Sequence, residues 1–114
     1  MSADVLVVTT NEVANTRIAR VIAPVYGTAI RSRNFVGNAL GNVRAVFGGN
    51  QGGFVEMLNH TRDEAIAALQ AHAASVGANA VVGMRFDSGE FDAGEKQSMA
   101  EITAYGTAVI LESV

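Results

Sequence analysis

Two segments near the start of the chain have residue patterns that favour β-strands. The segment 4–10, DVLVVTT, is rich in Val and Thr and predicts a first strand. The segment 16–30 has Arg17 and Arg20 among the apolar Ile18, Val21, Ile22 and Val25 and predicts a second, longer strand. Pro24 lies inside it without a backbone N–H, so it predicts an edge position, a bulge or a bend.

Two segments in the middle have apolar residues at spacings of three and four, which is the helical period. The first, 36–47, predicts a short helix, although Gly37 and Gly41 disfavour one. The second, 52–77, is longer, and Gly77 favours a left-handed stop at its end. One side of this helix carries the predicted apolar stripe, formed by Phe54, Met57, Leu58, Thr61, Ala65, Ala68, Leu69, His72 and Val76.

Two further strands are predicted over 78–86 and 98–114, joined by a polar hairpin loop over 87–97. The predicted order is therefore β-β-α-α-β-β. Strands at both ends with helices between them indicate one α+β domain over residues 1–114. Its sheet should be mainly antiparallel, with helices on one face.

The strand over 78–86 and the end of the last strand are apolar on both faces. A sheet covered on one side should alternate instead, so a second face needs a cover. Charged residues make up only 17% of the chain, which leaves little charge for the surface. We therefore expect another copy of the chain to cover this face, with the interface at Val82, Met84, Val109 and Leu111.

Composition excludes several classes of function. The chain has no Cys, which excludes disulfides, thiolate metal sites and a cysteine nucleophile. Its net charge is −3 and no Lys/Arg cluster occurs, which argues against nucleic acid or a membrane as partner. The N-terminus lacks the pattern of a signal peptide and no apolar run approaches the length of a membrane span, so a cytoplasmic protein is expected.

Both histidines are candidates for binding. His72 lies on the apolar stripe, where it could ligate a metal or line a ligand pocket, or be a core or interface histidine with hydrogen-bonded nitrogens. Glu56, His60 and Glu64 follow one another at spacings of four, along one exposed helix edge. Such an edge could clamp a divalent metal ion, or it could be an ordinary solvated face.

The glycine-rich segment 48–53, GGNQGG, precedes the long helix. Backbone N–H groups at a helix N-terminus can hold an anion, so Asn50 and Gln51 could bind a small polar ligand. The alternative is a flexible connector, because the Lys-Ser/Thr of a phosphate loop is missing. The acidic loop 87–97 does not match a calcium loop, and no serine lies in a G-x-S-x-G context, so no catalytic residues are predicted.

Several motifs together resemble the YbjQ-like family, a group of small bacterial and archaeal proteins of unknown function described as "putative heavy-metal-binding". They are VTT (8–10), FGGNQGGF (47–54), L..TR..A (58–65), GANAVVGM (77–84) and GTAV (106–109). The resemblance covers nearly the whole chain. It implies an α+β, dodecin-like subunit that assembles into a ring-like homopentamer.

The chain departs from the family pattern at three places. Gly48 to Gln51 stand where the family has Gly-Gly-Arg-Ser, and Phe54-Val55 where it has Tyr-Glu. Tyr26-Gly27-Thr28 replace the family's Ser-Gly-Glu. A polar cluster built from that arginine and those acids would be missing here.

Three functions are consistent with these observations. The first is a homo-oligomer, expected to be a pentamer, that binds a small ligand or a divalent metal ion at its subunit interfaces. The second is a non-catalytic scaffold for a protein partner. The third is an enzyme with a site shared between subunits, which has the least support.

Overall fold

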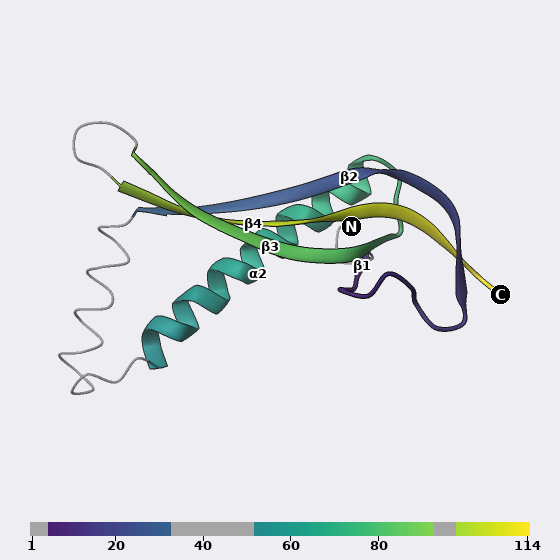
Figure 1. Ribbon diagram of the computed structural model, residues 1–114, viewed down its shortest axis with the longest axis horizontal. Coiled ribbons are helices and arrows are strands. Elements are labelled where there is room, and N and C mark those ends of the chain that lie inside the picture. The colour runs from purple at the N-terminus through teal and green to yellow at the C-terminus, as the bar shows by residue number, and fades with distance from the viewer. Residues whose placement is uncertain (1–4, 33–51, 93–97) are drawn as a thin grey trace.

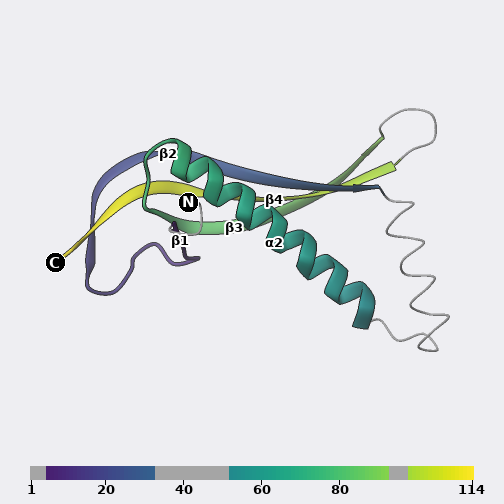
Figure 2. The ribbon, with the colours of Figure 1, turned by 180° about the vertical axis from the view of Figure 1, so that it is seen from behind.

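The computed structural model describes residues 5–32, 52–92 and 98–114, which form a curled sheet with a helix across one face (Figure 1; Figure 2). In chain order the elements are β1 (Leu6–Val7), β2 (Thr16–Ser32), α2 (Gly52–Ser75), β3 (Ala80–Asp92) and β4 (Ser98–Ser113). The strands lie side by side in the order β1-β3-β4-β2. The predicted α+β class is confirmed.

The sheet is mainly antiparallel, as predicted, because β4 pairs antiparallel with both β2 and β3. It is mixed, since the short β1 runs parallel to β3. One prediction about the strands was wrong. The predicted loop over 87–97 is wrong for residues 87–92, which extend β3 as far as the pair Asp92↔Ser98. The acids and glycines there tolerate a strand because this end of the hairpin is solvent-exposed. The helix predicted over 36–47 lies outside the described residues.

Pro24 lies on an edge strand, as predicted, because β2 is the last strand of the sheet. The pairing of β2 with β4 shifts register between Ile18 and Arg20 and again between Val21 and Ala23. Each shift leaves an extra residue in β2, and such bulges bend a strand and increase its twist. The N-terminal part of β2, which contains the two bulges, curls together with the C-terminal part of β4 (Figure 1).

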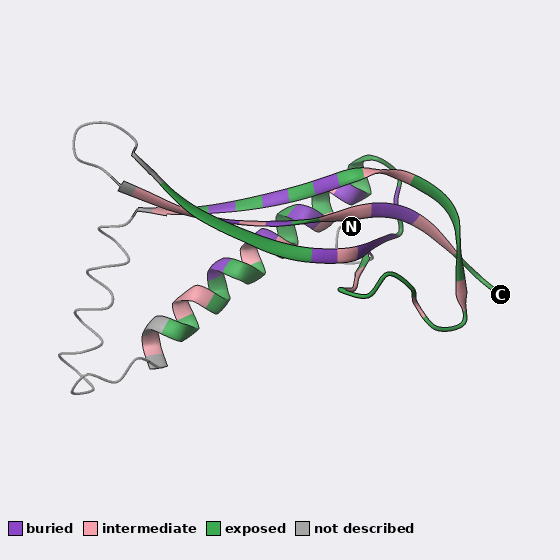
Figure 3. Ribbon diagram, viewed as in Figure 1, coloured by how far each residue is buried: buried purple, intermediate pink, exposed green. Residues whose placement is uncertain are grey.

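One face of the sheet packs on α2. The buried helix residues Thr61, Ala65, Leu69 and Ala73 repeat every four positions, whereas Ala68 is exposed, so the contact stripe is narrower than predicted. Along β2, buried and exposed residues alternate between Val25 and Ile30 (Figure 3).

Gly27 of β2 lies directly under the backbone of α2. A Cβ atom built on Gly27 would come within 2.2 Å of the Leu69 N and 2.5 Å of the Ala65 O. Glycine is therefore the residue that allows the helix and the sheet to approach this closely at Gly27.

The opposite face has its own small apolar cluster at the curled end of the sheet. Ala80, Val82 and Val109 are buried there, and Val8 and Leu111 pack against them. The chain just after β1 continues to pair with β3. Val8 N–H donates to Val81 O (3.0 Å), and Gly83 N–H donates to Thr10 O (2.8 Å). A single chain therefore supplies both apolar environments of this strand.

This burial changes the basis of the predicted interface. Val82 is 7% exposed, Met84 6% and Val109 0% within one chain, and Leu111 is partly buried. Met84 belongs to the larger cluster that includes Leu69 of the helix. The premise that these residues need a second copy to cover them is wrong. The prediction failed because the sequence does not show that the sheet curls. Association of copies itself stays a prediction.

Among the described residues, no helix is both long and apolar enough to cross a membrane. The cytoplasmic location stays a prediction.

Candidate functional site

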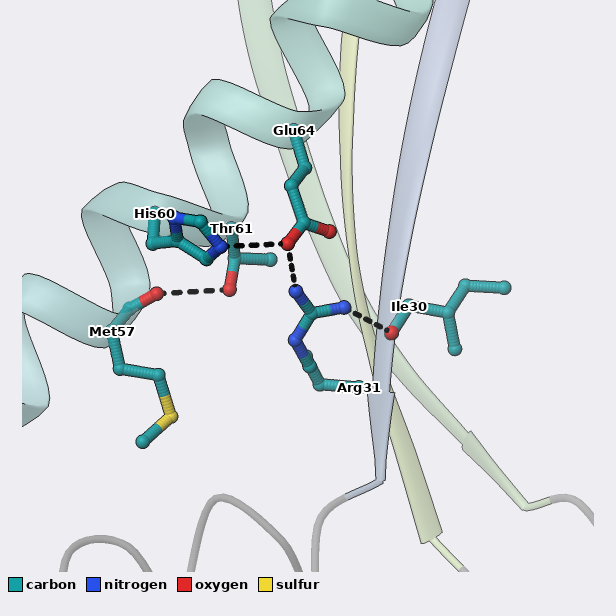
Figure 4. Close-up of polar contacts among 6 residues, drawn as sticks. All are labelled: Ile30, Arg31, Met57, His60, Thr61 and Glu64. Atoms are coloured by element: carbon teal, nitrogen blue, oxygen red, sulfur yellow. Dashed lines mark hydrogen bonds and ion pairs between the residues drawn. The ribbon is translucent and has the colours of Figure 1, made fainter.

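Three charged or polar side chains meet where β2 ends beside α2 (Figure 4). Arg31 donates from Nη2 to Glu64 Oε1 and from Nη1 to Ile30 O (2.9 Å). His60 Nε2 lies 3.0 Å from the same Glu64 oxygen, one helical turn away. The guanidinium is thus fixed by a carboxylate and by a backbone carbonyl, and Glu64 is shared between two neighbours.

The predicted metal set is only partly brought together. His60 and Glu64 are in contact, but the described residues contain no group of three or more His, Asp or Glu that could hold a metal ion, so Glu56 does not complete the set. Arg31 places a permanent positive charge on the Glu64 oxygen that a metal ion would need. A cation at that position would face repulsion from the guanidinium.

His72 is half-buried and lies beside the outer edge of β2. Its Nδ1 is 3.2 Å from both the backbone nitrogen and the carbonyl oxygen of Tyr26. The His72 and Tyr26 rings contact edge-on, with their centroids 4.8 Å apart. The imidazole therefore covers backbone groups that an edge strand leaves without a partner strand. A ligand-binding role of His72 stays a prediction. Asn50 and Gln51 lie outside the described residues.

A pocket of about 460 Å³ opens between the N-terminal half of α2 and the β3–β4 hairpin, next to Arg31. The helix α2 crosses the sheet diagonally, so its N-terminal half diverges from the strands (Figure 2). The apolar part of the wall consists of Met57, Leu58, Phe86, Ala100 and Ile102. The polar part includes Arg31, Thr61, Arg62, Ser88 and Glu90.

Sequence reasoning missed this pocket because it assigned 87–97 to a loop. Phe86, Ser88 and Glu90 follow a period of two, and so do Ala100 and Ile102 on the partner strand. In the structure these positions share the face of the hairpin that looks towards α2. The alternation in the sequence was the signal that could have placed them on one wall.

The charges of the pocket are unevenly compensated. Arg31 is paired with Glu64, and Glu90 has an interaction of its own. Glu101, which also lines the pocket, accepts a hydrogen bond from Thr103 Oγ1. Arg62 donates from Nη1 to the neutral Asn59 Oδ1 at 3.0 Å, and it forms no ion pair with any other described residue. The pocket therefore combines an apolar floor with one cation that has only a neutral partner among the residues the structure describes.

The family model YbjQ_1, described as "Putative heavy-metal-binding", matches residues 5–112. The chain belongs to the YbjQ family. A UPF0145 protein of Acidiphilium cryptum is 74% identical over 111 residues, which are 97% of this chain and 97% of that protein. A UPF0145 protein of Lactococcus lactis subsp. cremoris is 41% identical over 111 residues, covering 97% of this chain and 98% of that protein.

The fold of this chain is similar to that of a solved structure. The crystal structure of a DUF74-family protein of unknown function from Pediococcus pentosaceus superposes with a TM-score of 0.56. The match covers 95% of this chain and 98% of that chain at 13% identity. At this identity the likeness concerns the fold alone.

The described residues of this YbjQ-family chain do not fit a heavy-metal site. Soft metal ions favour thiolate ligands, and the chain has no Cys. The His60–Glu64 pair supplies two donor groups, and one of them already binds a guanidinium. A site of this kind lacks the three or four converging ligands that bind zinc in proteins.

We expect Zn²⁺ uptake to be the same for the wild-type chain and for His60→Ala. The reason is that His60 and Glu64 offer too few ligands beside a fixed cation. Native mass spectrometry with micromolar Zn²⁺ measures the bound ions per chain. Uptake by the wild type that disappears in His60→Ala would instead establish a metal site on this helix edge.

Proposed function

We propose that the protein is a non-catalytic, homo-oligomeric module that binds a small, largely apolar molecule between α2 and the β3–β4 hairpin. The pocket described above carries this proposal. Its volume lies within the range of about 300–1,000 Å³ typical of small-molecule sites, and apolar walls with a few polar groups are the usual composition of such sites. The family's metal description receives no support from the side chains around the pocket.

A neutral fluorescent probe tests the pocket. N-phenyl-1-naphthylamine should gain fluorescence on binding the wild-type chain, and Ser88→Phe should abolish that gain by filling the space. Asp87→Phe is the matched control, because neighbouring residues of a strand point to opposite faces and Asp87 does not line the pocket. Equal fluorescence with both variants would place the probe elsewhere and overturn the proposal.

The face of the sheet turned away from α2 supports the assembly part of the proposal. Tyr26 and Tyr105 lie opposite each other on β2 and β4 and are 61% and 45% exposed. Beside them Thr28 donates to Thr103, which in turn donates to Glu101, and Ile30 is also exposed. Exposed aromatic and aliphatic side chains grouped on one face are typical of protein interfaces. The proposed occupant of this face is a second copy of the chain, within a homopentamer.

Tyr105→Glu is expected to dissociate the assembly. A carboxylate buried between copies would lose its hydration, whereas in the single chain position 105 is 45% exposed and leaves the carboxylate in water. Light scattering should give five chain masses for the wild type and one for Tyr105→Glu. Val76→Glu, which alters an exposed residue at the end of α2, should keep the wild-type mass. A monomeric wild type, or an unchanged mass for Tyr105→Glu, contradicts this part of the proposal.

A further inference from the structure

We propose that the ligand of this pocket is an amphipathic anion: an apolar body that lies against the walls and a carboxylate or similar group bound by Arg62. The inference rests on the proposed function, since it names the chemistry of the molecule in that pocket. The inference follows from the positions of the charged side chains that line the pocket and from the described partner of each.

Among the described residues that line the pocket, Arg62 is the cation without a charged partner. Arg31 also lines the pocket, but Glu64 and the Ile30 carbonyl hold its guanidinium. Arg62 has the neutral oxygen of Asn59 as its hydrogen-bond acceptor, which uses one of five N–H donors. The remaining donors of Arg62 have no described acceptor and are available to a ligand.

The position of Arg62 joins this charge to the apolar wall. Leu58 and Arg62 are four residues apart on α2, so they lie one above the other on the same side of the helix, and both line the pocket. Across the pocket, Phe86 and Ile102 of the hairpin complete the apolar surface. A molecule lying along Leu58 therefore brings one end to the Arg62 guanidinium.

The physical preference is for an anion at that end. A guanidinium and a carboxylate can form two parallel hydrogen bonds, and bonds between charged partners are shorter and stronger than neutral ones. Arg62 is exposed, so water screens part of this attraction and the two hydrogen bonds supply its geometry. A ligand with a cationic end would be repelled by the same group.

Three probes with the same eight-carbon chain test this inference: octanoate, octan-1-ol and octylammonium. Isothermal titration of the wild-type chain should show octanoate binding about tenfold or more tightly than octan-1-ol, and octylammonium weakest, because a hydrogen bond to a charged group contributes more than a neutral one. Arg62→Gln should remove the difference between octanoate and octan-1-ol.

Arg17→Gln is the matched control. It removes the same unit of charge, but Arg17 pairs with Glu112 at an exposed position outside the pocket lining. The preference for octanoate should persist in this variant. A preference that survives in Arg62→Gln, or falls equally in Arg17→Gln, overturns the role of Arg62. Equal binding of octanoate and octan-1-ol by the wild type overturns this inference alone, whereas failure of all three probes overturns the proposed function.

Discussion

Replacing Val109 with Asp is expected to unfold the single chain, not merely to separate copies of it. Val109 is fully buried in the cluster with Ala80 and Val82, on the face away from α2. A carboxylate there would lose its hydration without gaining a described partner, which costs about 4 kcal/mol or more. Circular dichroism during a urea titration at fixed protein concentration measures the loss of the cooperative transition.

Two further variants keep this prediction testable if the Asp variant does not fold. Val109→Ala should lower the free energy of unfolding by about 2 kcal/mol, from two lost methyl groups and the cavity they leave. Val21→Asp makes the same chemical change at the residue opposite Val109 on β2, but Val21 is 63% exposed, so unfolding should be nearly unchanged. A well-folded Val109→Asp monomer would show that a partner, and not the chain, buries this residue.

Gly27→Ala is expected to lower the free energy of unfolding by about 3 kcal/mol, at the upper end of the usual range for overpacking. The new methyl group would overlap with backbone atoms of Ala65, Ala68 and Leu69, which cannot rotate away as a side chain can. The helix must shift away from the sheet, so contacts elsewhere on the stripe weaken as well. Urea unfolding followed by circular dichroism measures the change.

Gly89→Ala is the control for this substitution. A Cβ on Gly89 would meet only the end of the Glu101 side chain, at 3.3 Å. The expected change in the free energy of unfolding is within about 0.5 kcal/mol, as for most exposed positions. If Gly27→Ala were as stable as Gly89→Ala, α2 would not lie on β2 as closely as the structure shows.

Local patterns predicted the elements well where one periodicity dominates. The long helix was expected over 52–77 and is observed over 52–75, with Gly77 at a φ of 85° just after it. An edge position, a bulge or a bend was expected at Pro24 because proline lacks an N–H, which is a property of a single residue, and Pro24 lies on the edge strand β2. These features depend on neighbouring residues, so the sequence contains the information needed to predict them.

The predictions that failed depend on long-range geometry. The apolar run around Val82 indicated two buried faces, which was correct, but the cover comes from the chain segment around Val8 and from the curl of β2 and β4. The β3 register shift between Val82 and Arg85, with Gly83 at a φ of 65°, belongs to the same geometry. Neither bulges nor curl have a periodic signature, so a partner was inferred in their place.

In the candidate sites, too, contacts set by local spacing were predictable and contacts between distant segments were not. The contact between His60 and Glu64 was predictable from their spacing on a helix, whereas Arg31 reaches Glu64 from a strand 33 positions earlier. That ion pair changes the chemistry of the site, because it occupies the carboxylate that a metal ion would need. It also leaves Arg62 as the cation without a charged partner among the described residues of a neighbouring pocket, which the sequence did not reveal.

Methyl NMR of the chain labelled with ¹³C at its methionine methyl groups tests the central claim most directly. Met57 lines the pocket, while Met84 is buried in the core between α2 and the sheet and serves as an internal reference. With octanoate added to saturation, the Met57 methyl signal should shift and show contacts to the octanoate chain, and the Met84 signal should stay in place. An unchanged Met57 signal, or equal shifts of Met57 and Met84, would contradict a ligand site between α2 and the hairpin.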